Sequence, residues 1–433
     1  MSRCGSALLL LFISVALAAD APDLREPDWL RVTGLDAPPA LAARAAILVE
    51  VESRTVLYAL NPDLVIPPAS LTKLVAIDAA LSALDRGAVS LSEPFSPPVS
   101  AWAENQPAGS SLMFLGADQQ LTMHDLLLGL AVSSGNDAAV ALAEIIDGSV
   151  PAFADRMTAT MRELGLIDLF FVEPSGLSPR NTVTARSFAR FLLAHLARFP
   201  EAIDDYYSVK TYTYPRDENR VGAGARLPIT QANRNTLLWD LEGVDGFKTG
   251  FIDESGYNLA ATAERDGRRL IVIVLGVEAD SHALGGALRA RDAAALLEYG
   301  FGSFTTLRLG YPEPSPVRVY RGAEREVVPE GPRDLVITIP AGSEERIEGK
   351  IDQRLEVVAP TDRAVVGEVE IVLDGVRLAS ESLVLPAQEQ SGFWRRLWDS
   401  IALAFRRVGA RVRGEEPPAT MSELQSTRVR SAP

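Results

Sequence analysis

Strand-like segments flank a long helical region, and this order constrains the fold more than any other feature of the sequence. Residues 45–60 hold two β-rich runs around a polar Ser53-Arg54 turn. Residues 256–277 hold two more runs around Asp266-Gly267, a dipeptide typical of tight hairpins. Strands this far apart in sequence, with helices between them, predict a sheet with helices packed on it.

The helical region between these segments carries start and stop signals. Apolar residues recur at helical spacing after Ser70, and the pattern ends at Gly87. Thr122 and Asp125 are spaced as a capping box, and Thr184 fits the N-cap of a later helix. We therefore expect several helices to pack on the sheet.

The residues after 305 have a different texture. From 306 to 390 the chain consists of short β runs, and one pair of runs is separated by Asp374-Gly375, again a hairpin dipeptide. The length of 433 residues also exceeds that of an average domain. We predict a small all-β domain over residues 306–390, and no motif in it indicates chemistry.

Residues 391–413 predict a basic amphipathic helix. Six arginines accompany a single acid, Asp399, in a chain whose formal net charge is −15. Such a helix suits the surface of an anionic membrane, and the alternative is a core helix that docks on the β domain. Residues 414–433 have the composition of a disordered tail. The predicted apolar stripe consists of Trp394, Leu397, Trp398, Ile401, Phe405, Val408 and Val412.

Residues 1–18 have the pattern of a signal peptide. A basic residue precedes a short apolar run, and Ala16-Leu17-Ala18 offers a cleavage site. The run is too short for a comfortable membrane span, and an uncleaved anchor is the alternative. Cys4, the only cysteine, precedes the run, so the exported product would carry neither thiol nor disulfide. Residues 19–40, which contain several prolines, are expected to be a lead-in segment.

Charge and motifs argue against several classes of function. The net charge of −15 argues against a nucleic-acid partner, which would require a basic face. The histidines at 124, 195 and 282 are scattered without the spacing of metal ligands. No Walker loop, G-x-G-x-x-G stretch or G-x-S-x-G elbow occurs. We therefore expect no metal, no cofactor and no histidine-based triad.

Ser70 and Lys73 form the first candidate catalytic pair. The chain has only four lysines, and one of them follows Ser70 by three positions at the predicted start of a helix. Residues at i and i+3 share a helix face, so the hydroxyl and the amine can meet. A serine needs a base to become a nucleophile. Lysine can supply that base if desolvation or a second cation lowers its pKa, whereas arginine stays protonated.

Two further stretches fit this pair. Ser134-Gly135-Asn136 lies between two predicted helices, where a hydroxyl and an amide can relay a proton and hold a substrate amide. Lys248-Thr249-Gly250 lies on a predicted strand, and its glycine lets a substrate backbone lie against the strand edge. The charge of Lys248 would help to keep Lys73 neutral and would attract a carboxylate. Each stretch alone is a weak signal, but together the three stretches predict a single site for acyl transfer, to which each contributes side chains.

With these motifs in this order, the chain resembles the low-molecular-mass penicillin-binding D-alanyl-D-alanine carboxypeptidases. The resemblance covers most of residues 40–410 and includes "PPASLTKL", "SSGNDAA", "QANRNTLLWDLEGVDGFKTG" and "SGYNL". It implies an α+β fold, with a β-lactamase/transpeptidase-like domain over residues 41–305 that has an antiparallel sheet and helices on its faces. A small all-β domain and a C-terminal amphipathic helix would follow.

The resemblance also implies a role for each candidate residue. Ser70 would be the acylated nucleophile, Lys73 its general base, and Ser134 a proton shuttle toward the leaving amine. The implied substrate-binding residues are Asn136, Arg234, Lys248, Thr249, Gly250 and Phe251.

Within the binding set, Arg234 matches the arginine that recognises the terminal carboxylate in the family, and Lys248 and Thr249 would bind near it. The backbone N–H groups of Ser70 and Phe251 would form the oxyanion hole. The family often has histidine where this chain has Phe251. The backbone role does not depend on this change, but a contribution of the histidine side chain to deacylation or substrate preference is not expected to carry over.

The implied activity is removal of the terminal D-alanine from peptidoglycan stem peptides through an acyl-enzyme, which β-lactams would also form. The implied location is the periplasmic face of the cytoplasmic membrane, with residues 391–413 in contact with the lipid surface. A D,D-endopeptidase shares the same site, and a β-lactamase is the nearest rival, although the chain lacks an E-x-x-L-N stretch. A non-catalytic wall-binding protein is the alternative outside the enzymes.

Overall fold

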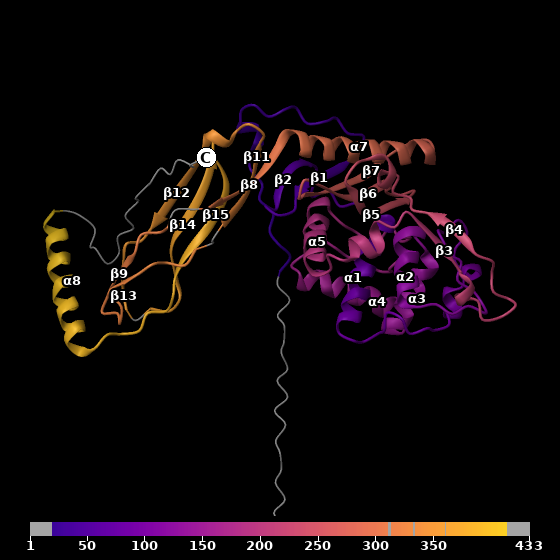
Figure 1. Ribbon diagram of the computed structural model, residues 1–433, viewed down its shortest axis with the longest axis horizontal. Helices are drawn as coiled ribbons and strands as arrows, with labels where there is room; N and C mark the ends of the chain where they lie inside the picture. The colour runs from indigo at the N-terminus through magenta and orange to yellow at the C-terminus, as the bar shows by residue number, and fades with distance from the viewer. Residues whose placement is uncertain (1–19, 311–312, 332–333, 360, 414–433) are drawn as a thin grey trace, which may run out of the picture.

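The computed structural model describes residues 20–310, 313–331, 334–359 and 361–413. The predicted signal peptide and the predicted tail of residues 414–433 lie outside the described residues. Figure 1 shows a mixed part of helices and strands, and beside it a strand-rich part that ends in the separate helix α8 (Phe393–Arg413).

A five-stranded sheet lies at the centre of the mixed part, with the order β2-β1-β7-β6-β5 and every neighbouring pair antiparallel. β1 pairs directly with β7, so the two predicted strand segments, residues 45–60 and 256–277, meet in one sheet, as predicted. The strands are β1 (Ala45–Glu50), β2 (Thr55–Leu60), β5 (Val244–Ile252), β6 (Gly256–Arg265) and β7 (Arg268–Val277).

Both predicted hairpins of this sheet form, and their turns use left-handed backbone. Asp266 and Gly267 have φ angles of 51° and 74°, as a two-residue turn between twisted strands requires. In the first hairpin Arg54 takes the left-handed conformation, with φ of 58°. Ser53 in the same turn is buried, and its hydroxyl oxygen lies 2.7 Å from that of Thr338 in the strand-rich part.

Helices cover both faces of the sheet, which confirms the predicted fold class. α7 (His282–Ser303) lies along one face, and α5 (Ala185–Arg198) packs on the other. In β1, Ile47 contributes to the core on the α5 side and Leu48 to the core under α7. A strand covered on both faces buries every residue, which explains why β1 reads as a continuous apolar run.

The remaining helices and one small hairpin surround the α5 side of the sheet (Figure 1). They are α1 (Thr72–Asp85), α2 (Met123–Leu128), α3 (Asn136–Asp147), α4 (Val150–Glu163), β3 (Thr211–Tyr214) and β4 (Ile229–Ala232), whereas the short helix α6 (Leu237–Asp240) contributes Leu237 and Leu238 to the core on the α7 side. The capping box at Thr122 and Asp125 and the N-cap at Thr184 are present as predicted.

The strand-rich part consists of small sheets around one apolar core that includes Ile337, Leu373 and Leu378. Asp374 and Gly375 form its predicted hairpin turn, with φ angles of 52° and 80°. The strands are β8 (Phe304–Gly310), β9 (Val317–Tyr320), β10 (Glu326–Val327), β11 (Asp334–Pro340), β12 (Ile347–Gln353), β13 (Glu356–Val358), β14 (Ala364–Leu373) and β15 (Val376–Leu385).

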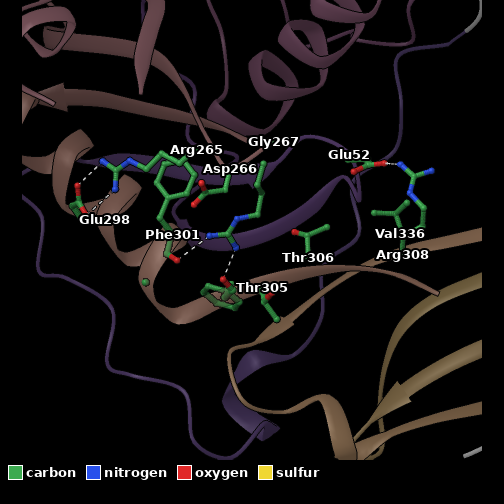
Figure 2. A pocket seen from close by; sticks show the side chains of 13 residues that line it. Glu52, Arg265, Asp266, Gly267, Glu298, Phe301, Thr305, Thr306, Arg308 and Val336 are labelled. Atoms are coloured by element: carbon green, nitrogen blue, oxygen red, sulfur yellow. Dashed lines mark hydrogen bonds and ion pairs between the residues drawn. The ribbon is translucent and has the colours of Figure 1, made fainter. Parts of the chain in front are cut away.

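Charged side chains line the junction of the two parts, which Figure 2 shows from close by. Arg265 pairs with Glu298 at 2.7 Å, and Arg308 pairs with Glu52. Arg268 donates hydrogen bonds to carbonyl groups at the end of α7 and the start of β8. These residues border a cavity of about 600 Å³, and each of its three arginines has a partner within the protein.

The lead-in segment connects the two parts. Arg25 forms a bridge with Thr55 at the start of β2. Its guanidinium donates to the carbonyl of Val336 at 2.7 Å and pairs with Glu381 at 2.9 Å, both in the strand-rich part. One residue before the sheet therefore touches both halves of the molecule.

α8 presents its aromatic residues to solvent. The side chains of Trp394, Trp398 and Phe405 are 72%, 69% and 75% exposed, while Leu403 is buried. None of the described helices is both long enough and apolar enough to span a membrane.

Polar contacts attach α8 to the strand-rich part. Asp399 accepts a hydrogen bond from the backbone N–H of Arg321 at 2.6 Å, and Arg395 donates to the carbonyl of Ala323 at 2.9 Å. The side chains of residues 407–413, which include the last two members of the predicted stripe, lie outside the described residues.

Candidate active site

Ser70 lies in a short 3₁₀ turn (Ala69–Leu71) that leads into α1. Asn258 of β6 donates to the carbonyl of Pro67 at 3.1 Å and so ties the turn to the sheet. Ala69 has φ of 51°, a left-handed conformation that costs an alanine on the order of 1–2 kcal/mol. The local strain is held by tertiary contacts, as is common at functional sites.

Lys73 is buried one helical turn after Ser70. Its Nζ atom lies 3.1 Å from Ser70 Oγ, so the contact of hydroxyl and amine that the spacing predicts is present. The same atom donates to Asn136 Oδ1 at 2.7 Å and to the carbonyl oxygen of Ser175 at 2.5 Å. Three oxygen atoms thus hold the amine next to the hydroxyl.

Burial lowers the pKa of Lys73 to about 7. The carboxylates of Glu173 and Asp137 raise this pKa, and the Arg234 guanidinium lowers it. The sequence suggested that desolvation, with help from the charge of Lys248, keeps Lys73 neutral. Desolvation is the main cause and the Arg234 guanidinium contributes, while Lys73 and Lys248 also repel each other. At neutral pH a large fraction of Lys73 is unprotonated and can accept a proton from Ser70.

Ser134 and Asn136 lie at the junction of two helical segments, as predicted. A π-helical turn (Gly129–Ser133) ends at Ser134, whose φ of 58° is left-handed, and α3 begins at Asn136. Both side chains are buried and border the same cavity as Ser70. Asn136 contacts Lys73, whereas Ser134 forms no hydrogen bond with Lys73 in the part of the chain that the structure describes.

Asp137, which the sequence analysis did not select, shapes the neighbouring wall. Its buried carboxylate accepts hydrogen bonds from the three backbone N–H groups of residues 113–115 at 2.9, 2.8 and 3.0 Å. This holds Ser110 and Ser111 at the rim of the cavity. An acid in the first turn of α3 is the signal that could have selected it, since a helix N-terminus favours negative charge.

Lys248-Thr249-Gly250 lies on β5, the edge strand of the sheet, as predicted. A Cβ atom on Gly250 would lie 2.8 Å from the carbonyl oxygen of Pro68 and 3.1 Å from the backbone N of Ser70. A glycine therefore lets the strand approach the nucleophile. Thr249 lines the cavity, while Lys248 is buried with its Nζ atom 3.1 Å from the Thr249 carbonyl oxygen.

Four basic side chains surround this region: Lys73, Arg234, Lys248 and Arg289. Burial, together with the charges of Lys73, Arg234 and Arg289, lowers the pKa of Lys248 well below its ordinary value. Burial and Arg234 lower the pKa of Arg289 to about 10. Within the described residues none of the four forms an ion pair with a carboxylate, so an anionic ligand would supply the missing charge.

Arg289 borders the site although no sequence motif indicated it. It lies on α7, borders the cavity and donates to the carbonyl groups of Gly250 at 2.9 Å and Asn258 at 3.4 Å. No local sequence pattern marks it. Only the packing of α7 against the sheet brings it to the site.

Phe251 forms an aromatic cluster at one end of the cavity. Its ring centroid lies 4.4 Å from that of Tyr257 and 4.8 Å from that of His282. The Tyr257 hydroxyl oxygen is 2.8 Å from His282 Nδ1, and all three residues border the cavity. An imidazole therefore reaches the site from α7, although the position after Lys-Thr-Gly holds phenylalanine.

Every predicted site residue lies in this cavity of about 360 Å³ or directly behind its wall. The lining residues among them are Ser70, Ser134, Asn136, Arg234, Thr249, Gly250 and Phe251. The arrangement provides a nucleophile, a base of lowered pKa and a cationic pocket, which are the parts needed for acyl transfer to an anionic peptide. Among the described residues, no group of three or more histidine, cysteine, aspartate or glutamate side chains could hold a metal ion.

Comparison with known proteins agrees with this geometry. Residues 33–279 match the sequence family described as D-alanyl-D-alanine carboxypeptidase. The chain is 35% identical to D-alanyl-D-alanine carboxypeptidase DacA of Haemophilus influenzae over 379 residues, which cover 85% of this chain and 91% of that relative.

Solved structures give the same result. Penicillin binding protein 5 from Haemophilus influenzae superposes with a TM-score of 0.72 at 35% identity, and covers 82% of this chain and 100% of that structure. Penicillin-Binding Protein D2 from Listeria monocytogenes, in its ampicillin-bound form, superposes with a TM-score of 0.52 at 30% identity. That match covers 61% of this chain and 100% of the Listeria structure.

Proposed function

The chain belongs to the D-alanyl-D-alanine carboxypeptidase family, and from this premise we propose that it removes the terminal D-alanine from peptidoglycan stem peptides through an acyl-enzyme on Ser70. The observation that carries the proposal is the buried pair of Ser70 Oγ and Lys73 Nζ, 3.1 Å apart, in which the lysine has a pKa of about 7. A neutral amine at this distance can take the proton of the hydroxyl.

Acylation begins when the Lys73 amine accepts the Ser70 proton and Ser70 Oγ attacks the carbonyl carbon between the two terminal D-alanines. The backbone N–H groups of Ser70 and Phe251 stabilise the oxyanion. Ser134 relays the proton held by Lys73 to the leaving amine, and D-alanine departs. Water then attacks the ester carbonyl while the Lys73 amine accepts its proton, and that proton passes to Ser70 Oγ as the shortened peptide leaves.

Substrate recognition depends on the terminal carboxylate. Arg234 and Thr249 bind it at the cavity, and Lys248 contributes positive potential from behind the strand. Arg289 adds a second guanidinium at the same end. The amide of Asn136, whose oxygen contacts Lys73, has its N–H₂ group left to hold the substrate amide.

β-Lactams are proposed to acylate the same serine. The Listeria relative is solved in its ampicillin-bound form. The comparisons favour the carboxypeptidase over the β-lactamase, the endopeptidase and the non-catalytic wall-binding alternatives, since both the matched family and the Haemophilus relative carry that name.

Replacing the nucleophile tests the function. In Ser70→Ala we expect no penicillin adduct by intact mass and at least about 10³-fold slower D-alanine release from a pentapeptide substrate. Ser82→Ala, on the same helix α1 but outside the cavity, is the matched control and should behave as the wild type. A stable adduct on Ser70→Ala would refute the assignment of the nucleophile.

The chain is proposed to be divided as the sequence suggests, with a catalytic domain over 41–305, a β domain over 306–390 and a membrane-surface helix over 391–413. The exposed aromatic residues of α8 support the last assignment, because solvent-facing tryptophans beside arginines suit the interface of an anionic membrane. The protein would then be held peripherally on the periplasmic face.

Vesicle binding tests the role of α8. The double variant Trp394→Glu/Trp398→Glu should lose sedimentation with vesicles of phosphatidylethanolamine and phosphatidylglycerol, and should keep its D-alanine release. Val365→Glu, at an exposed apolar residue of β14, is the control and should bind as the wild type. Equal binding by the double variant and the wild type would exclude α8 as the membrane contact.

A further inference from the structure

A loop on the helical side of the cavity closes over Lys73. Gly176, with φ of 85°, lies so near the nucleophile turn that a Cβ atom on it would be 1.9 Å from the carbonyl oxygen of Ala69. One residue earlier, the carbonyl oxygen of Ser175 accepts a hydrogen bond from Lys73 Nζ at 2.5 Å. Both contacts come from backbone, so their geometry depends on what holds residues 173–178 in place.

Glu173 holds this backbone. Its carboxylate accepts hydrogen bonds from the N–H groups of Ser175, Gly176 and Ser178 at 2.7, 2.8 and 3.2 Å, and from the Ser175 hydroxyl. One carboxylate oxygen serves Ser175 and the other serves Gly176 and Ser178. An amide could not replace it, because one of its two ends would present N–H₂ to these donors.

Asn181 links Glu173 to the catalytic helix. Its Nδ2 atom donates to Glu173 Oε1 at 3.0 Å and to Thr72 Oγ1 at 3.2 Å. Thr72 is the neighbour of Lys73 at the start of α1. The negative charge of Glu173 is also the largest of the influences that raise the pKa of Lys73 against the effect of burial.

We propose that Glu173 is a positioning residue for acylation, which shapes the 173–178 loop so that the Ser175 carbonyl fixes the Lys73 amine beside Ser70. The inference rests on the proposed roles of Ser70 and Lys73. It assigns to one carboxylate two effects that can be separated by experiment: the geometry of the loop and the charge near the amine.

The test measures the second-order rate of acylation by a fluorescent penicillin as a function of pH. Glu173→Gln should acylate at least about tenfold more slowly, since small misplacements of catalytic groups are this costly. The acidic limb of its profile should lie at lower pH than in the wild type, because losing the negative charge lowers the pKa of Lys73. Glu173→Asp keeps the charge but not the reach, so its rate should fall while its limb stays near the wild-type position.

Asp168 provides a matched control. It is a carboxylate that precedes the same loop and accepts hydrogen bonds from Thr184 and Ser187 at 2.6 Å each, without influence on Lys73. Asp168→Asn should keep both the wild-type acylation rate and the wild-type position of the acidic limb of the pH profile. If its rate and limb change as those of Glu173→Gln do, the effect is general loosening of the loop and the inference is wrong.

The remaining outcomes are also decisive. A Glu173→Gln protein with wild-type rate and limb would overturn the inference. If thermal unfolding shows that this variant does not fold, Glu173→Asp decides, and a wild-type rate in that variant overturns the inference. A wild-type protein that forms no penicillin adduct would instead contradict the proposed function, so the two failures are distinguishable.

Discussion

The cavity at the junction and the catalytic cavity are both lined by arginines, and they differ in how their charges are matched. At the junction of the two parts, Arg265 and Arg308 each pair with a glutamate, and Arg268 binds carbonyl groups. In the catalytic cavity, Arg234 and Arg289 have no carboxylate partner among the described residues. The junction cavity is the larger, at about 600 Å³ against 360 Å³. Unmatched charge, and not size, distinguishes the catalytic cavity from the junction cavity.

The difference has an energetic meaning. Partly desolvating cations without counter-ions destabilises a fold, because the desolvation is not offset by attraction to a carboxylate. The molecule tolerates this only where a ligand brings the missing anion. Substitutions in the catalytic cavity should therefore change kinetics more than stability, and substitutions at the junction should do the reverse.

The largest effect is expected for Lys73→Arg. Arginine keeps the positive charge but stays protonated, so acylation by penicillin should fall by about 10²–10⁴-fold. In the wild type, kcat/KM should fall below pH about 7, where Lys73 becomes protonated, and this limb should be absent from the variant. Lys210→Arg, at an exposed lysine outside the cavity, is the control. An arginine variant with wild-type rate at pH 7 would remove Lys73 from the mechanism.

A smaller effect is expected for Arg234→Gln. Loss of a charge-assisted hydrogen bond to the terminal carboxylate, worth about 1.5–3 kcal/mol, should lower kcat/KM by roughly 10–100-fold. Arg234 lowers the pKa of Lys73, so its removal should move the acidic limb to higher pH, opposite to the shift expected for Glu173→Gln. The melting temperature should not fall, since the exposed side chain forms no ion pair within the described residues. A limb that moves to lower pH would contradict this assignment.

The smallest effect is expected at the junction. Arg265→Gln removes an ion pair with the exposed Glu298, and such pairs contribute at most about 1 kcal/mol to the free energy of unfolding. We expect a small decrease in melting temperature and unchanged acylation kinetics. A changed acylation rate would show that the junction is coupled to the site, and the contrast between the two cavities would fail.

The sequence predicted what local chemistry determines. The hairpin dipeptides at 266–267 and 374–375, the capping box at Thr122 and the spacing of Ser70 and Lys73 all depend on neighbours within a few residues. These features are present in the structure.

Features that arise from tertiary packing could not be predicted in this way. The lowered pKa of Lys73 comes chiefly from burial, which a motif does not show. Arg289 reaches the cavity from a helix far along the chain, and the contact of Lys73 with Ser175 uses a backbone carbonyl. A backbone carbonyl is present whatever the side chain is, so the residue type at position 175 does not indicate this contact.

The position of Arg25 has a consequence for how the molecule melts. Its segment bridges the edge of the central sheet at Thr55 and binds Val336 and Glu381 in the strand-rich part. Unfolding of either half would break these interactions, so the free energies of unfolding of the two halves are linked. We expect one cooperative calorimetric transition for both halves, and a ligand that covalently occupies Ser70 should also protect the distant strands from hydrogen exchange.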